Sequence, residues 1–274
     1  MEEFNLTNKK ITKVITFPVP ITLGEIKEEL TIRSTSSSTP SKEQVINQAF
    51  KYHSQGNISE ASKYYQLFIN QGFKDHRVFS NYGVILKNLE QFKEAEELQR
   101  KAIALNPDFT DAYYNLGNVL RALGHLQEAE KSTRKAIELN PNFTDAHLNL
   151  GSILRDLGNL QEAEKSTRKA IELNPNFANA HSNLGSILRD LGNLQEAEKS
   201  TRKAIELNPN FSEAYSNLGN ILKDLGNLQE AEKSIRKAIE LNPNFTEAHS
   251  NLGNVLRDLG NLQEAEKSIR KAIE

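Results

Sequence analysis

The chain has 274 residues, a formal net charge of -2 and no cysteine. This charge balance offers no clustered basic surface of the kind that binds nucleic acid, and the lack of cysteine excludes disulfides and thiolate metal sites. Apolar residues make up only 37% of the chain, which suits an array with a thin buried seam. No segment resembles a signal peptide or a membrane-spanning helix, so the sequence predicts a soluble cytoplasmic protein without a membrane partner.

Residues 1–41 are non-repetitive. They end in a Ser/Thr-rich stretch that we predict to be a flexible linker, and no fold is predicted for them. Residues 42–75 are predicted to form a degenerate repeat, because Gly56, Ala61 and Tyr65 are in phase with later copies. An atypical unit is expected where a repeat array must be capped.

From residue 76 onward the sequence repeats with a period of 34 residues, marked by the tripeptide Asn-Leu-Gly. A period of this size is typical of a solenoid, in which copies of one structural unit stack on each other. We therefore predict six units, the last of them incomplete. They span residues 76–109, 110–143, 144–177, 178–211, 212–245 and 246–274.

Each unit is predicted to contain two helices. In the third unit an apolar stripe marks the first helix, for which Thr144 is expected to supply a hydroxyl cap. This helix is predicted to end at Gly158, because glycine is favoured just past a helix C-terminus. Asn159 is predicted to cap the second helix with Glu162 as its capping-box partner, and Pro175 ends that helix.

These positions resemble the tetratricopeptide repeat, whose pattern is an aromatic residue, then Leu-Gly, Gly, Ala, Ala and Pro. The matching residues of the third unit are His147, Leu150, Gly151, Gly158, Ala163, Ala170 and Pro175. The resemblance covers residues 42–274. It implies an all-α fold, a right-handed superhelical solenoid of about seven helix-turn-helix repeats.

Gly151 and its equivalents are interpreted as places where two helix backbones approach too closely for a Cβ atom. The chain departs from the family late in the second helix, where small or aliphatic residues replace a bulky aromatic one. These are Thr133, Thr167, Thr201, Ile235 and Ile269. We expect thinner apolar contact there, offset by the phenylalanine that recurs at each repeat junction.

One asparagine recurs on the first predicted helix of every unit. Because an amide is both donor and acceptor, a row of amides can hold the backbone of an extended peptide without reading its side chains. The alternative is that each asparagine satisfies a backbone group between adjacent units. The row resembles the superhelical arm of O-linked N-acetylglucosamine transferases, which implies a peptide-binding groove lined by Asn81, Asn115, Asn149, Asn183, Asn217 and Asn251.

A column of cations runs beside this row. Its members are Lys87, Arg121, Arg155, Arg189, Lys223 and Arg257. From the third unit on, each is followed directly by an aspartate: Asp156, Asp190, Asp224 and Asp258. The favoured explanation is a solvated face with weak ion pairs between neighbouring units. The alternative, kept as part of the candidate site, is that the cations from Arg121 onward select polar side chains of a bound peptide.

Three histidines, His147, His181 and His249, recur in phase. They stand where sister units have an aromatic residue, and none has a second ligand at helical spacing, so we predict packing residues and no metal site. Phosphate loops, nucleophile elbows and thiol nucleophiles are absent, and the Asn-x-Ser/Thr sequons are explained as turns and caps. The sequence therefore predicts no catalytic residue and no cofactor.

The function predicted is that of a protein–protein interaction scaffold, not an enzyme, which binds an extended peptide or partner protein in a concave groove. One alternative is the substrate-recruiting arm of a larger glycosyl- or sulfotransferase, whose catalytic domain would lie beyond residue 274. Another is a structural array without a specific ligand. The sequence stops inside the second helix of its last unit, so self-association through that apolar end is a further expectation.

Overall fold

The computed structural model describes residues 40–273, and these form fourteen α-helices and no strand. The all-α prediction is therefore confirmed. The chain divides into two units, Met1–Lys74 and Asp75–Glu274. The described part of the smaller unit holds α1 (Lys42–Ser54) and α2 (Ile58–Asn70). The segment predicted to lack a repeat lies almost wholly outside the described residues.

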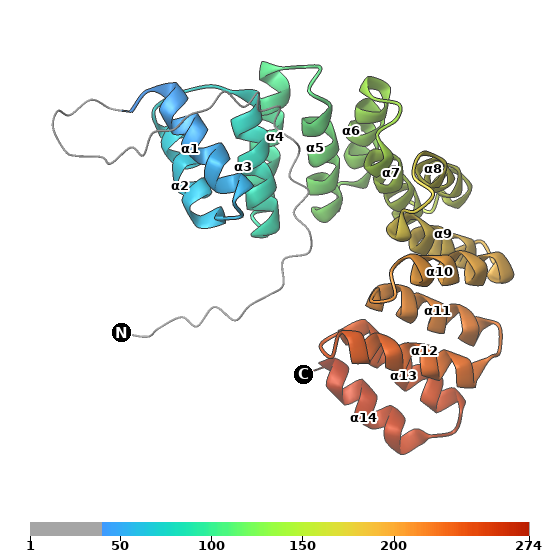
Figure 1. The fold of residues 1–274 in the computed structure, drawn as a ribbon. Coiled ribbons are helices and arrows are strands. Elements are labelled where there is room, and N and C mark those ends of the chain that lie inside the picture. Colours follow the sequence, from blue (N-terminus) through green and yellow to red (C-terminus); the bar gives the residue numbers. More distant parts are fainter. Residues whose placement is uncertain (1–39, 274) are drawn as a thin grey trace, which may run out of the picture. The chain divides into compact units, whose positions relative to one another are not determined.

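The larger unit consists of helix pairs that follow one another along the chain (Figure 1). We call the odd-numbered helices first helices and the even-numbered ones second helices. The early pairs are α3 (His76–Asn88) with α4 (Phe92–Leu105), α5 (Thr110–Ala122) with α6 (Leu126–Leu139), and α7 (Thr144–Asp156) with α8 (Leu160–Leu173). The later pairs are α9 (Ala178–Asp190) with α10 (Leu194–Leu207), α11 (Ser212–Asp224) with α12 (Leu228–Leu241), and α13 (Thr246–Asp258) with α14 (Leu262–Ile273).

Every first helix of the larger unit packs against its own second helix, and that second helix packs against the next first helix. Successive first helices also contact one another, whereas successive second helices make no comparable contact. The first helices are thus more closely spaced, and the stack curves toward them as a right-handed superhelical solenoid. They line the inner, concave face of the larger unit, and the second helices line the outer face.

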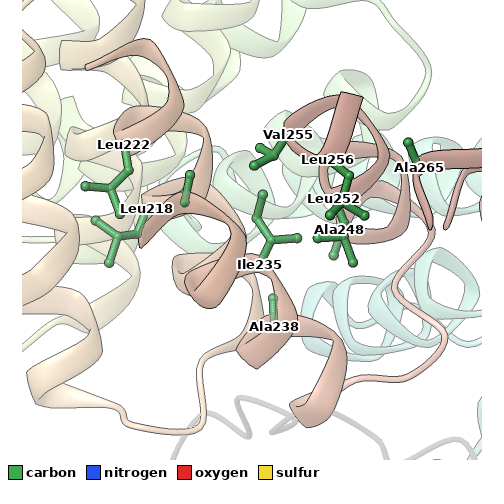
Figure 2. Close-up of a cluster of buried hydrophobic side chains, with 10 residues drawn as sticks. Leu218, Leu222, Ile235, Ala238, Ala248, Leu252, Val255, Leu256 and Ala265 are labelled. Carbon is green, nitrogen blue, oxygen red and sulfur yellow. The ribbon is translucent and has the colours of Figure 1, made fainter. Parts of the chain in front are cut away.

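The core is a continuous seam between neighbouring pairs (Figure 2). Ile235 of α12 is fully buried and lies between Leu218 and Leu222 of α11 on one side and Leu252 of α13 on the other. Burying one such side chain contributes about 1.5–3 kcal/mol. Because each second helix buries its apolar side against two first helices, neither kind of helix is stable alone, and the repeats hold one another in place.

Close approach of the two helices in a pair explains the recurrent glycine. A Cβ atom on Gly151 would lie 2.1 Å from Oγ1 of Thr167 and 3.2 Å from the carbonyl oxygen of Ala163. The predicted role of this glycine is confirmed. Thr167 is fully buried, and its hydroxyl donates to the Ala163 carbonyl over 2.9 Å. A threonine fits here because its polar group has a partner within its own helix.

The C-terminal glycine of the first helix was predicted correctly. Gly158 has a φ of 80°, its amide donates to the carbonyl of Arg155, and the amide of Asn159 donates to the carbonyl of Leu154. Wrapping back in this way satisfies the last carbonyls of α7, and only glycine enters this backbone region without a penalty.

The predicted side-chain caps were wrong. Asn159 occupies the position before α8, but its side chain makes no capping hydrogen bond, and Thr144 begins α7 without one. Glu162 forms an ion pair with Arg134 of α6 at 2.8 Å and so does not reach back to its own helix start. The carboxylate has a cationic partner in the preceding repeat, which sequence spacing within one helix does not reveal.

Candidate functional site

The recurring asparagines of the inner face are tied to serines of the preceding repeat. Asn217 donates through Nδ2 to Oγ of Ser182, and Asn251 donates to Oγ of Ser216, each over 3.1 Å. Asn115 makes the equivalent bond to Ser80 over 3.2 Å. The amides therefore hold adjacent repeats in register, as the structural alternative required, but their partners are side-chain hydroxyls and not backbone groups.

Two repeats break this pattern because Tyr114 and Leu148 stand where the others have serine. Asn149 donates instead to Oγ1 of Thr133 over 3.4 Å, and Asn183 donates to Oγ of Ser152. The Oδ1 atom of Asn183 is buried and has no hydrogen-bond partner in the described part of the chain. Because this oxygen is shielded from solvent, it is also shielded from a ligand on the inner face.

The asparagines of the row differ in how far they are exposed to solvent. Asn115 and Asn149 are only 8% and 7% exposed. Asn81, Asn183, Asn217 and Asn251 are partly exposed. An amide nitrogen carries two N–H groups, and one bond to a serine leaves the second N–H available, together with the oxygen except at Asn183, where it is buried. The inner face thus offers usable amides mainly along α9, α11 and α13.

Ion pairs between repeats occupy three of the six neighbouring cations. Arg121 contacts Asp156 at 2.6 Å, and the equivalent pairs Arg155–Asp190 and Arg189–Asp224 are 2.5 Å long. These side chains are about one-third exposed, so each pair contributes little to stability. Their main effect is to cancel the charge beside the asparagine row.

The ion pairs between repeats are missing at both ends of the column of cations. Lys223 has no ion pair within the described residues, and Arg257 contacts only its neighbour Asp258, at 3.6 Å. Lys87 also lacks a carboxylate partner in the part of the chain described, because Ala122 stands where later repeats have aspartate. Burial without a partner lowers the pKa of Lys87.

Two acids at the start of first helices are also affected by burial. Desolvation raises the pKa of Asp111, and it raises the pKa of Asp145. Neither carboxylate has an ion pair among the described residues. Both lie in the first turn of their helices, where the helix dipole favours the charged form and opposes this shift.

The histidines have a structural partner. Nε2 of His147 lies 2.9 Å from the carbonyl oxygen of Pro141, and His181 and His249 make the same contact with Pro175 and Pro243. Each imidazole therefore bridges the turn between two repeats. In the described part of the chain no three His, Asp or Glu side chains gather where they could hold a metal ion.

Sequence reasoning missed the serines that receive the amide hydrogen bonds. Ser80, Ser182 and Ser216 each directly precede an asparagine of the row, yet each accepts from the asparagine of the next repeat, 35 residues away. The recurrence of serine at one phase was a usable signal. This signal alone could not show that successive first helices lie in contact, which brings each serine to the asparagine of the next repeat.

A family model described as the tetratricopeptide repeat matches this chain in successive copies. The matches cover residues 76–109, 110–143, 144–177, 178–211, 212–245 and 235–267. A search of curated proteins finds no match. None of the described helices is both long and apolar enough to cross a membrane.

Several solved structures are similar to this chain. YrrB, described as a TPR protein with an unusual peptide-binding site, is 26% identical, with a TM-score of 0.51, over 67% of this chain and 95% of its own. TTC0263 from Thermus thermophilus is 24% identical, with a TM-score of 0.59, over 67% of this chain and 100% of its own. A tetratricopeptide repeat protein from Parabacteroides merdae is 18% identical, with a TM-score of 0.71, over 84% and 91%.

Proposed function

The chain belongs to the tetratricopeptide repeat family, and we propose that its inner face binds an extended segment of a partner protein. The repeat is a scaffold typical of protein–protein interaction. The observation that carries the proposal is the row of partly exposed amides on α9, α11 and α13, each fixed by one hydrogen bond and retaining at least one unused group. YrrB, similar in fold, is described as having a peptide-binding site.

Fixed amides suit peptide recognition for an energetic reason. A side chain that is already held in place loses less conformational entropy when a ligand binds. Asn217 and Asn251 can then each donate one N–H to, and accept one N–H from, the backbone of an extended chain, whereas Asn183 can only donate because its oxygen is buried. At about 0.5–1.5 kcal/mol net for each hydrogen bond, three amides supply only part of a useful affinity, so the rest must come from side-chain contacts.

The flanking charges support a ligand of mixed polarity. The Arg–Asp pairs leave the middle of the inner face near neutral, whereas Lys223 and Arg257 at its far end are not held in a pair between repeats. On α5 and α7, Tyr114 and Leu148 stand where other first helices have serine, and they place apolar side chains there. We therefore expect a ligand with an apolar residue near α5 and α7 and an acidic or polar one near α11 and α13.

The test uses a displayed library of unstructured peptides, selected against the intact protein. Peptides that bind are then measured against the triple variant Asn183→Ala, Asn217→Ala and Asn251→Ala. The matched control is Asn193→Ala, Asn227→Ala and Asn261→Ala, because these asparagines belong to the same repeats, are exposed, and precede second helices. We expect binding to fall by about tenfold or more in the inner variant and to be unchanged in the control.

Equal binding by both variants, with equal helicity, would remove the amide row from the binding surface. Selection of no inner-face peptide at all would count against the proposal in the same way. Replacing Asn115 and Asn149, which are buried, should weaken peptide binding less than replacing the three partly exposed amides.

Self-association through the last repeat also stays a proposal. Ile269 of α14 is 37% exposed, whereas the equivalent Ile235 of α12 is fully buried under α13, and Ile273 is 82% exposed. A second copy could cover this apolar face. Sedimentation at increasing concentration should show a dimer that Ile273→Lys abolishes, and a monomer at all concentrations would rule this contact out.

A further inference from the structure

The outer face of the larger unit carries a second repeated feature. Open clefts of 860–1080 Å³ lie between the successive second helices from α4 to α12. They exist because the second helices are spaced apart by the first helices between them. In the cleft between α8 and α10, Ile171, His181 and Leu184 form the floor. Ile171 is only partly buried, so the floor is an apolar surface that water reaches.

The rim of that cleft is charged, and nearly all its charges are already paired. Arg168 reaches Glu164 on its own helix and Glu196 on the next one. Arg202 does the same with Glu198 and Glu230. Glu172 and Glu206 are each paired with a lysine of their own helix. Within the described residues, Lys199 is the one charged side chain of this rim without an ion pair.

The equivalent lysine lacks an ion pair in each of these four clefts of the described structure. Each second helix from α6 to α12 has three glutamates, one arginine and two lysines. The arginine binds one glutamate of its own helix and one of the next, and the second lysine binds another glutamate of its own helix. Every glutamate is thus paired, and the first lysine has no acid left. The lysines left without an ion pair in the described structure are Lys131, Lys165, Lys199 and Lys233, and each lines a cleft.

We propose that these outer clefts bind an amphipathic helix of a partner protein, with an aliphatic face flanked by carboxylates. An aliphatic face would cover the Ile-Leu floor and remove it from water. A carboxylate at its margin would pair with the unused lysine. A groove between two neighbouring helices is the shape that a third helix fills with its side-chain ridge.

Charge complementarity selects a different protein over a second copy of this chain. On the second helices from α6 to α12 every glutamate is held in an ion pair, so an outer face cannot offer a free carboxylate to another outer face. Two such faces would instead bring their unpaired lysines together. The occupant must therefore supply acids that this surface lacks.

The experiment uses a fluorescein-labelled helical peptide with leucines at i, i+3 and i+7 and glutamates beside them, together with the same peptide carrying glutamine at those sites. The test variant combines Lys131→Glu, Lys165→Glu, Lys199→Glu and Lys233→Glu, four exposed changes that alter every cleft of the series, and glutamine at the same four positions is the milder version. The matched control is Lys223→Glu, the same change at an unpaired lysine of the inner face. Circular dichroism confirms that all variants keep their helicity.

Fluorescence anisotropy should show that the fourfold glutamate variant binds the acidic peptide about tenfold more weakly than the wild-type protein. The fourfold glutamine variant should lose less affinity, and the control should lose none. The glutamine peptide should bind wild-type protein about as weakly as the acidic peptide binds the glutamine variant. Failure of the acidic peptide to bind, or equal binding by both proteins, would overturn the proposal. So would anionic vesicles that bind through these lysines while the peptide does not. The inner triple asparagine variant should bind this peptide normally, which separates this proposal from the function proposed for the inner face.

Discussion

The helix pair α3–α4 and the pairs from α7 to α12 have the same backbone but different polar contacts. The later pairs are joined by an Arg–Asp pair on the inner face, and a second arginine bridges the outer helices. At α3–α4 the outer bridge is kept, from Arg100 to Glu128, but the inner one is lost. Packing is therefore common to all copies, whereas the inner ion pairs are an addition that the copies carrying Lys87 and Lys223 fold without.

The glycine seam shows what the two regions must share. A Cβ atom on Gly83 would lie 2.6 Å from Nε2 of Gln99, and one on Gly219 would lie 2.3 Å from Cγ1 of Ile235. The opposing residue is amide, hydroxyl or aliphatic in different copies, yet the glycine never changes. Close backbone approach is thus the constant requirement, and the residue that faces it is free to vary.

The largest effect is expected at this shared seam. Gly185→Leu should destabilise the protein by about 1 to 3 kcal/mol, because even its Cβ atom would lie 2.0 Å from Oγ1 of Thr201 and 3.1 Å from the Ala197 carbonyl oxygen. Thermal unfolding followed by circular dichroism measures the loss. Gln195→Leu, an exposed change in the same repeat, is the control and should leave the melt nearly unchanged. An unaltered melt for the glycine variant would refute the packing role.

A gain in stability is expected from a substitution in the turn between α3 and α4, where this copy departs from the later ones. Glu90 has a φ of 62°, in the left-handed region where the later copies have glycine, such as Gly124 at 78°. Glu90→Gly should stabilise the larger unit by about 1 kcal/mol, since a side chain in this conformation clashes with its own backbone. The reverse change Gly124→Glu should cost a similar amount. Urea unfolding of both variants measures the effect, and opposite signs are required.

Much of this fold can be predicted from the sequence because the packing contacts within a helix pair are local and recur in every copy. The period of 34, Leu150, Gly151 and Gly158 together define two helices, their close contact and the turn between them. The side-chain partners could not be predicted in the same way. Glu162 and Asn217 bond to residues of the preceding repeat, and which neighbour they reach depends on the tilt between repeats. The candidate site remains a prediction from its pattern. Which of its amides are exposed could not be predicted, because that depends on side-chain packing between repeats, where Tyr114 and Leu148 replace serine.

The smallest effect is expected from giving Lys87 the partner that later cations have. Arg121 pairs with Asp156, 35 residues on, and the equivalent position for Lys87 is Ala122. Ala122→Asp should add less than about 1 kcal/mol at neutral pH, because the new pair remains near solvent. Ala122→Asn, which adds a similar volume without charge, is the control and should add nothing.

The pH dependence makes this small effect measurable. In the unaltered protein burial lowers the pKa of Lys87, so the unfolded chain holds that proton more tightly than the folded one. The unfolding free energy should therefore rise as pH increases from the folded pKa to the ordinary value of about 10.4. Ala122→Asp raises the pKa of Lys87, so its stability gain is complete at neutral pH and disappears as Lys87 loses its proton. NMR titration of the Lys87 side chain should show a higher pKa in the aspartate variant than in the asparagine control. An unchanged titration would mean that Lys87 and residue 122 do not meet, and that the inner ion-pair column cannot be extended to α3.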